Sequence, residues 1–228
     1  MERKSLLILH CYGVYHRGDF YTEHPETTDV YRVQLQKSFD LLNNGSYDVL
    51  IISGGYTKPQ VEKSEARGMV DWAENLGLLR RKKDAVILLE EYAKDSLENL
   101  LFSMCRFFQF FGKFPYSVAS CTWRFNAERF QIFARKLLLP RYEVIAVGTQ
   151  PDEEKIARKW AEFAERDPFY VKQLDSRKKY LARDPWKKQH PYGQINENFR
   201  LFFEKIAEIK EGKGDVEKAQ FLLPWKNP

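Results

Sequence analysis

The sequence predicts an α/β protein with a Rossmann-like three-layer architecture, in which helices cover both faces of a mainly parallel sheet. Short apolar runs rich in β-branched residues, typical of buried strands, alternate with longer runs whose apolar residues recur at helical spacing. Such alternation is typical of parallel strands joined by right-handed crossovers. The chain of 228 residues is long enough to bury one sizeable core.

Five strands and five helices are expected in alternation. The helices begin at capping residues, and most of them stop at glycine or before proline. The expected strands are 6–11, 49–53, 85–89, 116–121 and 142–147, and the expected helices are 29–43, 64–77, 95–111, 124–138 and 152–166. Residues 12–28 are expected to form a long polar and aromatic loop, and long loops in compact domains are often functional.

The alternation then ends, and the chain changes character. We expect residues 1–166 to form a ligand-binding core and residues 167–228 to pack on that core as an extension within a single domain. A final helix is expected from about 196 to 210. The basic, aromatic segment 167–193 has two interpretations. It is a partial lid across the carboxyl edge of the sheet that brings Arg177 or Arg183 near Ser53-Gly54-Gly55, or a pad that shields an edge strand.

Charge and cysteine content narrow the class of protein. The net charge of +5, from 37 basic and 32 acidic residues, permits an anionic ligand without requiring nucleic acid. Cys11, Cys105 and Cys121 lack the spacing of a zinc site and predict buried thiols in a reducing compartment, so we expect a cytoplasmic protein. No apolar run approaches the roughly 20 residues of a membrane-spanning helix. The motifs of dinucleotide oxidoreductases, P-loop NTPases, zincins and α/β-hydrolases are absent.

The most informative local feature is Ser53-Gly54-Gly55, at the end of the second expected strand. Open α/β sheets bind ligands at the carboxyl ends of their strands. The two glycines would let a ligand approach free backbone amides closely. Ser64 and Glu65 open the helix that follows. The sequence therefore predicts a ligand site around this turn.

Several carboxylates and an amide fall at matching positions along the same edge. Glu90 ends the third expected strand, where few structural needs call for a carboxylate, so it is the first acid–base candidate and Glu65 is the second. Glu98 and Asn99 lie in the first turn of the third helix. We expect Gly55, Glu65, Glu90 and Asn99 to line one pocket. Converging carboxylates could raise the pKa of a general base or hold Mg²⁺.

Cations and hydroxyls complete the predicted site. Arg32 and Arg124 are expected to neutralise the ligand, and Ser120 to contact it. Two of these calls have structural alternatives. Arg32 could pair with Asp29, and the hydroxyls of Ser120 and Thr122 at the end of the fourth strand could reflect ordinary helix capping by Thr122. The basic tail also permits base stacking, but no RNA-binding signature accompanies it, so nucleic acid is not the expected partner.

These motifs resemble the domain of unknown function 218 family, also called SanA/YdcF/ElyC-like, over roughly the first 150 residues. The matching positions are Ser53-Gly54-Gly55, Ser64-Glu65-Ala66 with Met69, Glu90, Asp95-Ser96-x-Glu98-Asn99, and Arg32. The resemblance implies a Rossmann-like fold with a cleft at the strand ends, and S-adenosylmethionine binding is associated with one branch. Some bacterial members are membrane-anchored, and we do not expect that anchor here. Where the family often has histidine and, three residues later, arginine, this chain has Trp123 and Asn126.

The sequence therefore predicts a protein that binds a small anionic ligand, nucleotide-like or phosphorylated, at the carboxyl edge of the sheet. A hydrolase or transferase reaction would fit this site. The alternative is a noncatalytic binding or regulatory module, and RNA binding through the basic tail is the third hypothesis.

Overall fold

A computed structural model describes residues 3–22, 25–79, 85–149, 185–210, 219–220 and 222–226. The expected helix 152–166 and most of the basic segment 167–193 lie outside these residues. Both Arg177 and Arg183 are among the residues outside the described part of the chain.

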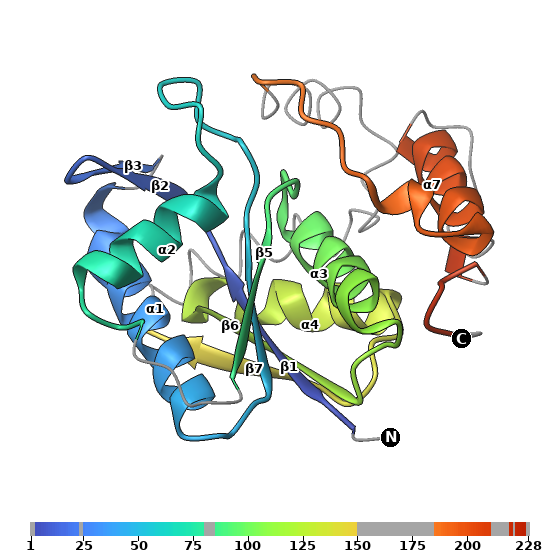
Figure 1. Ribbon diagram of the computed structural model, residues 1–228, viewed down its shortest axis with the longest axis horizontal. Coiled ribbons are helices and arrows are strands. Elements are labelled where there is room, and N and C mark those ends of the chain that lie inside the picture. Colours follow the sequence, from blue (N-terminus) through green and yellow to red (C-terminus); the bar gives the residue numbers. More distant parts are fainter. Residues whose placement is uncertain are drawn as a thin grey trace.

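Five parallel strands form the central sheet, in the order β5–β4–β1–β6–β7 (Figure 1). Their bounds are Ser5–His10 for β1, Val49–Ser53 for β4, Val86–Glu90 for β5, Ser117–Trp123 for β6 and Tyr142–Val147 for β7. After β1 the chain adds β4 and β5 on one side of that strand, and it then adds β6 and β7 on the other side. The sheet is therefore doubly wound, and its order reverses between β1 and β6.

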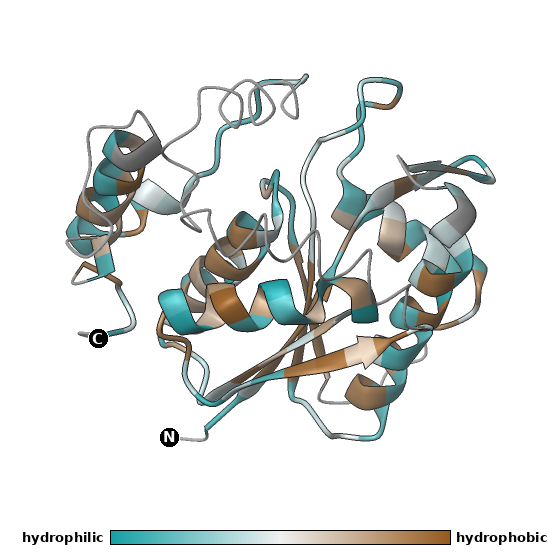
Figure 2. Cartoon of the chain, turned by 180° about the vertical axis from the view of Figure 1, so that it is seen from behind, coloured by the Kyte–Doolittle hydropathy of each residue, from teal (hydrophilic) through white to brown (hydrophobic). Residues whose placement is uncertain are grey.

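Helices cover both faces of this sheet, which confirms the predicted three-layer architecture. Their bounds are Thr28–Asn43 for α1, Glu65–Asn75 for α2, Ser96–Phe111 for α3, Ala127–Lys136 for α4 and Glu197–Lys210 for α7. Helices α1 and α2 pack on one face, while α3, α4 and α7 contribute to the core on the other. Figure 2 shows apolar and hydrophilic residues alternating along these helices, as expected for helices buried on one side.

The apolar strands divide their side chains between two cores. Leu6 and Ile8 of β1 face α3 and α4, whereas Leu7 and Leu9 face α1 and α2, and all four are fully buried. Successive side chains of a strand point to opposite faces, so a strand covered on both faces needs a continuous apolar run. This requirement explains why the sequence predicted the strands so directly.

The prediction of a loop over residues 12–28 was wrong in part. An antiparallel hairpin occupies much of it, with β2 at Gly13–His16 and β3 at Asp19–Thr22, followed by a short 3₁₀ turn at Pro25–Thr27. Arg17 and Gly18 form its turn with φ of 53° and 95°, the positive values that a tight two-residue hairpin requires. The sequence signal was weak because arginine seldom occupies such a position.

The start of the fourth helix also differs from prediction. Residues Arg124–Asn126 form a 3₁₀ turn before α4, and Thr122 belongs to β6. The expected capping role of Thr122 was therefore wrong: its hydroxyl instead lies 2.8 Å from the hydroxyl of Tyr12. In the part of the chain that the structure describes, no helix is long and apolar enough to cross a membrane.

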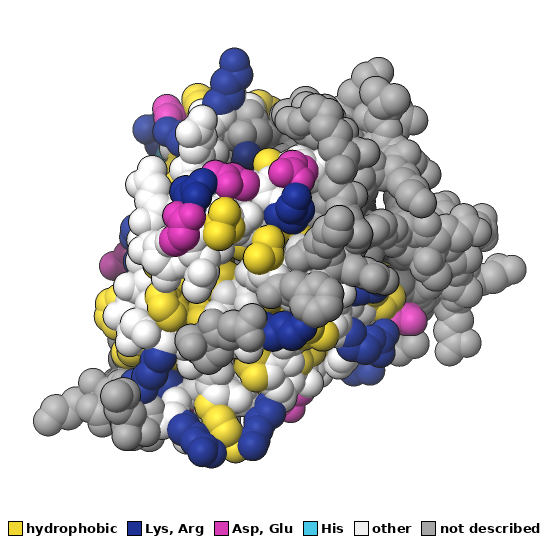
Figure 3. All heavy atoms as spheres, turned by 90° about the vertical axis from the view of Figure 1, so that its right-hand side faces the viewer, with side chains coloured by type: hydrophobic (Ala, Val, Ile, Leu, Met, Phe, Trp, Pro, Cys, Tyr) yellow, Lys and Arg dark blue, Asp and Glu magenta, His cyan; other side chains and the backbone are white. Residues whose placement is uncertain are grey.

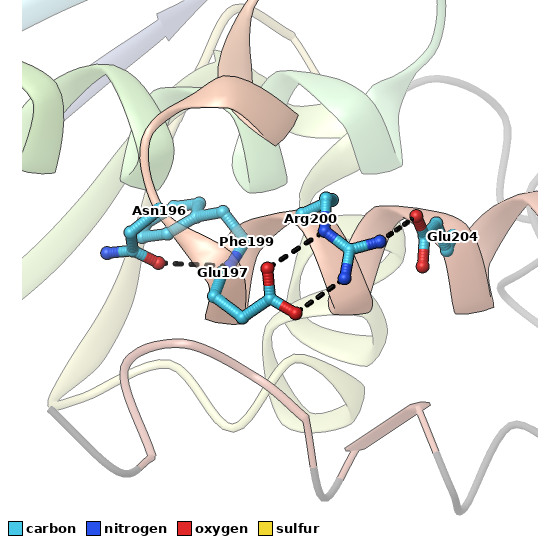
Figure 4. Close-up of polar contacts among 5 residues, drawn as sticks. All are labelled: Asn196, Glu197, Phe199, Arg200 and Glu204. Carbon is cyan, nitrogen blue, oxygen red and sulfur yellow. Dashed lines mark hydrogen bonds and ion pairs between the residues drawn. The ribbon is translucent and has the colours of Figure 1, made fainter.

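The end of the chain returns to the core through α7. Phe199, Phe202 and Ile206 on one side of the helix are buried beside α3 and α4. Its outer side carries ion pairs, including those of Arg200 with Glu197 and Glu204 (Figure 4). Figure 3 views the molecule from the right-hand side of Figure 1 and shows acidic and basic side chains close together on the upper part of that surface. Water screens such exposed pairs, so the apolar side of α7 determines its attachment.

Candidate functional site

A row of buried polar side chains crosses the sheet at its carboxyl edge. The strand pairing places Glu90 of β5 beside Ser53 of β4, and Ser53 beside His10 of β1. The register of β1 with β6 continues the row to Thr122. Side chains in register share one face of a sheet, here the face covered by α3 and α4. None of the four residues has exposed surface.

Glu90 is the best-connected member of this row. Its Oε2 atom accepts hydrogen bonds from Ser53 Oγ at 2.8 Å and from the amide of Ala93 at 3.2 Å. Its Oε1 atom accepts from the amide of Tyr92 at 2.8 Å and from the hydroxyl of Tyr192 at 3.2 Å. Burial raises the pKa of Glu90 to about 7, although the bonds from Ser53 and the two amides oppose this shift. A carboxyl group with a pKa near neutrality suits acid–base chemistry.

The first turn of α3 lies against the same row. Ser53 Oγ is 3.0 Å from Asn99 Oδ1, so Ser53 lies between Asn99 and Glu90, two of the four residues expected to line one pocket. Asp95 caps the helix by accepting from the amide of Glu98 at 2.8 Å, and Glu98 accepts from the amide of Lys94 at 3.0 Å. The bond to the Lys94 amide, one residue before the cap, gives Glu98 a structural role at the helix start.

The glycine turn serves internal packing, which corrects the predicted approach of a ligand to free amides. The amide of Gly54 donates to the carbonyl of Glu90 at 3.0 Å, and that of Gly55 donates to the carbonyl of Ala93 at 2.7 Å. A Cβ atom on Gly54 would lie 2.7 Å from Cys11 Cβ, and one on Gly55 would lie 2.6 Å from the Ala93 carbonyl oxygen. Both glycines therefore allow neighbouring backbone segments to approach closely.

Glu65 lies on the other side of this turn, so the expected pocket shared by Glu65, Glu90 and Asn99 is not found. It opens α2, which packs on the opposite face of the sheet. Its Oε1 atom accepts from Thr57 Oγ1 at 2.5 Å and lies 4.0 Å from Lys58 Nζ. Among the residues that the structure describes, no group of three or more histidine, cysteine or acidic side chains is arranged to hold a metal ion.

Ser64 stands at the start of α2 and makes two contacts. Its hydroxyl caps the helix by accepting from the amide of Arg67 at 3.0 Å, and it donates to Glu91 Oε1 at 2.7 Å. The capping bond gives Ser64 a structural role that the sequence alone did not separate from ligand binding.

The predicted cations lie nearer the surface. Arg32 is about half exposed and its Nη2 atom is 2.6 Å from Asp29 Oδ1, so the alternative ion pair is present. Arg124 is exposed and its Nε atom donates to the carbonyl of Gly148 at 3.3 Å. Their expected role in neutralising a ligand stays a prediction, as does that of Arg183.

Sequence reasoning passed over a third cation, Arg129, and the tyrosine near it. Arg129 Nη1 donates to Ser96 Oγ at 3.3 Å, at the first residue of α3. Its charge also acts to lower the pKa of Tyr12, against the larger effect of burial, which raises it. The charge of Arg129 therefore acts both at the start of α3 and on Tyr12, just after β1. The spacing of Asn126 and Arg129, one helical turn apart, was the available signal.

The described part of the C-terminal segment runs above α3 toward α7 and contacts the loops at this edge of the sheet (Figure 1). Trp186 Nε1 donates to the carbonyl of Lys58 at 3.0 Å, in the loop after the glycine turn. Lys188 Nζ is 3.1 Å from Glu62 Oε1. Tyr192 begins a 3₁₀ turn at Tyr192–Gln194, is buried, and reaches Glu90. Residues 185–194 thus contact the loop after β4 and the end of β5, while the choice between the lid and pad interpretations stays a prediction.

The geometry defines a class, a Rossmann-like α/β protein with a buried polar row at the carboxyl edge of its sheet. The chain is similar to the uncharacterized protein YOR238W of Saccharomyces cerevisiae (strain ATCC 204508 / S288c), with 23% identity over 163 residues. The match covers 62% of this chain and 52% of the relative, so the chain spans about half the length of the curated relative it matches. No family model and no solved structure matches the chain.

Proposed function

We propose that this protein binds a small anionic ligand, nucleotide-like or phosphorylated, at the carboxyl edge of the sheet between β1 and β6. One observation carries this proposal: Arg129 donates to Ser96 at the start of α3, and its charge acts on Tyr12, whose hydroxyl lies beside that of Thr122 where the strand order reverses. Ligands of open α/β sheets bind at such a point. A guanidinium group and a helix N-terminus both favour an anion.

The burial of so many polar groups supports a binding role for this edge. Polar side chains are costly to bury, and such groups concentrate at functional sites. The buried polar residues at the carboxyl ends of β1, β4, β5 and β6 and the starts of α3 and α4 are His10, Ser53, Glu90, Ser96, Glu98, Asn99, Ser120, Thr122 and Asn126. A core selected for stability alone would use apolar side chains at most of these positions.

A hydrolase or transferase reaction is the catalytic form of this proposal. Glu90 is its acid–base group because its pKa lies near neutrality. S-adenosylmethionine belongs among the ligands to test, as the resemblance to the domain of unknown function 218 family suggests. The alternative is a noncatalytic regulatory module, and a turnover screen with phosphorylated metabolites and S-adenosylmethionine separates the two.

The described part of the tail gives less support to RNA binding. Tyr192 is buried rather than available for stacking, and Lys188 is paired with Glu62. We place the protein in the cytoplasm because Cys11, Cys105 and Cys121 are buried free thiols, which fit a reducing compartment.

Arg129→Gln tests the proposed function. We expect this variant to bind the anionic ligand at least about tenfold more weakly, because a charge-assisted hydrogen bond is lost. Calorimetric titrations with inorganic phosphate, AMP, ATP and S-adenosylmethionine measure the effect. Arg135→Gln is the matched control, since Arg135 is exposed near the end of the same helix. Wild-type protein that binds none of these probes, or an Arg129→Gln variant that binds like wild type, would refute the proposal.

A further inference from the structure

His10 occupies the centre of the buried polar row and makes only half of its possible hydrogen bonds. Its side chain has no exposed surface, and its ring stacks on Phe130 with centroids 3.8 Å apart. Nε2 lies 2.7 Å from Ser120 Oγ. Within the described part of the chain, Nδ1 is a buried nitrogen with no hydrogen-bond partner.

The hydrogen bonds around Ser120 determine which nitrogen of His10 carries the proton. The hydroxyl of Tyr142 donates to Ser120 Oγ at 2.7 Å. Ser120 Oγ could accept a second bond from His10 Nε2–H, but its own buried proton would then have no acceptor among the described contacts. The arrangement that satisfies this proton has Ser120 donating to His10 Nε2 at 2.7 Å. A ring that accepts at Nε2 and stays neutral must carry its proton on Nδ1. Burial keeps the ring neutral, because it lowers the pKa of His10 to about 3.

This arrangement leaves a buried N–H group unsatisfied. Such a group loses its bonds to water on folding and gains none from the protein, which is destabilising. The ring is also held in place, since the Phe130 stack fixes its plane and the amide of Gln34 donates to the His10 carbonyl at 2.9 Å. A fixed and unsatisfied donor at the point of strand reversal has the features of a group prepared for a ligand acceptor.

We infer that His10 Nδ1–H donates a hydrogen bond to an oxygen atom of the bound anion, and that Tyr142 and Ser120 position it by fixing the tautomer. This inference rests on the proposed function and adds a specific contact to it. The acceptor is an oxygen of a phosphate or carboxylate group that enters the polar row. Ser120 thereby acts as a positioning residue, and the contact with the ligand belongs to His10.

Nitrogen NMR on protein with ¹⁵N-labelled histidine tests the tautomer without any ligand. The chain has four histidines, and the His10 signals are those that disappear in His10→Gln. We expect Nδ1 to be protonated and Nε2 to be bare. Tyr142→Phe should raise the share of the Nε2–H tautomer, because Ser120 Oγ then has no other donor and gains a bond by accepting from Nε2–H. A wild-type ring protonated on Nε2 would overturn the inference whatever the ligand results.

Two substitutions of His10 distinguish the contributions of Nδ1 and Nε2 to ligand affinity. The amide of His10→Gln can replace Nε2 and keep the Ser120 contact, whereas that of His10→Asn can replace Nδ1. With AMP and inorganic phosphate as probes, we expect His10→Gln to bind about tenfold more weakly or worse and His10→Asn to stay within about threefold of wild type. Urea unfolding of both variants shows whether a weaker affinity reflects a destabilised fold.

The outcomes distinguish this inference from the proposed function. Equal binding by wild type, His10→Gln and His10→Asn means that Nδ1–H serves only a buried water molecule, and the inference falls while the proposed function stands. Equal losses in both variants mean that the ring itself matters rather than the donor, which also overturns the inference. If wild type binds neither probe, the proposed ligand class and the contact to it fall together.

Discussion

The carboxyl group of Glu90 receives four hydrogen bonds and yet has a pKa near neutrality. It joins β4 through Ser53, the loop after β5 through two amides, and the C-terminal segment through Tyr192. Desolvation outweighs these donors, and the pKa rises to about 7 from the usual 4.5. Glu90 therefore connects three segments of the fold, and its charge state affects their stability.

We expect the free energy of unfolding to depend on pH through Glu90. Between about pH 4.5 and pH 7, the folded protein keeps a proton that the unfolded chain releases, so the stability present below pH 4.5 is lost as the pH rises through 7. The loss should reach at most about 3 kcal/mol. Glu90→Gln should remove most of this slope, as measured by urea unfolding from pH 5 to pH 8.

Glu128→Gln is the control for this pH dependence, because Glu128 is an exposed carboxylate on α4. It should keep the wild-type slope. The explanation fails if Glu90→Gln and wild type lose stability equally over this range. Lower stability of Glu90→Gln at pH 5 is expected in addition, since its amide nitrogen cannot accept from the donors that surround Glu90.

Single residues show where sequence reasoning succeeds. Ser53, Glu90 and Asn99 could be found because strand ends and helix starts are readable from local patterns. Arg129 and His10 were not among the predicted site residues, because the contacts that make them candidates, with Ser96 and Ser120, lie far away in sequence. The prediction of free amides at the glycine turn was wrong, because both amides donate to backbone carbonyls at the end of β5 and in the loop that follows it.

At the scale of elements, α2 illustrates how capping and ligand binding produce the same sequence pattern. A serine followed by an acidic residue is common at a helix start, and Ser64 does cap α2. Its second bond, to Glu91, joins the helix to the loop after β5. Sequence alone could not predict that bond, because it depends on how two crossovers meet at the sheet edge.

Ser64→Ala should distinguish a role of Ser64 in helix capping from a role in ligand binding. We expect it to lower the free energy of unfolding by about 1 kcal/mol, because a capping hydroxyl is lost, and to leave the affinity for AMP nearly unchanged. Urea unfolding and calorimetric titration measure the two effects. Ser64→Asn restores a capping side chain and should recover part of the stability. A large loss of affinity at constant stability would instead make Ser64 a ligand contact, as the sequence first suggested.

Across the whole molecule, the sequence predicts the central sheet better than the segments outside it, namely the β2–β3 hairpin and residues 185–194. Periodicity predicted the order of strands and helices because each buried face imposes its own repeat on the sequence. The hairpin β2–β3 was missed because it packs on α2 rather than on the sheet: Tyr15 stacks on Trp72 with centroids 6.0 Å apart. Irregular segments such as 185–194 carry no repeat, so their position depends on particular contacts.

Those contacts determine whether residues 185–194 act as a lid. Two of them, Trp186 to the Lys58 carbonyl and Lys188 to Glu62, lie outside the core, and only the bond of Tyr192 to Glu90 is fully buried. We expect saturating AMP to slow amide hydrogen exchange in 185–194, because a ligand at the strand ends would hold a lid closed. Trp186→Phe should speed this exchange by removing one hydrogen bond, while exchange in α7 stays as in wild type. Exchange that AMP leaves unchanged in a protein that binds AMP would identify the segment as a fixed structural pad.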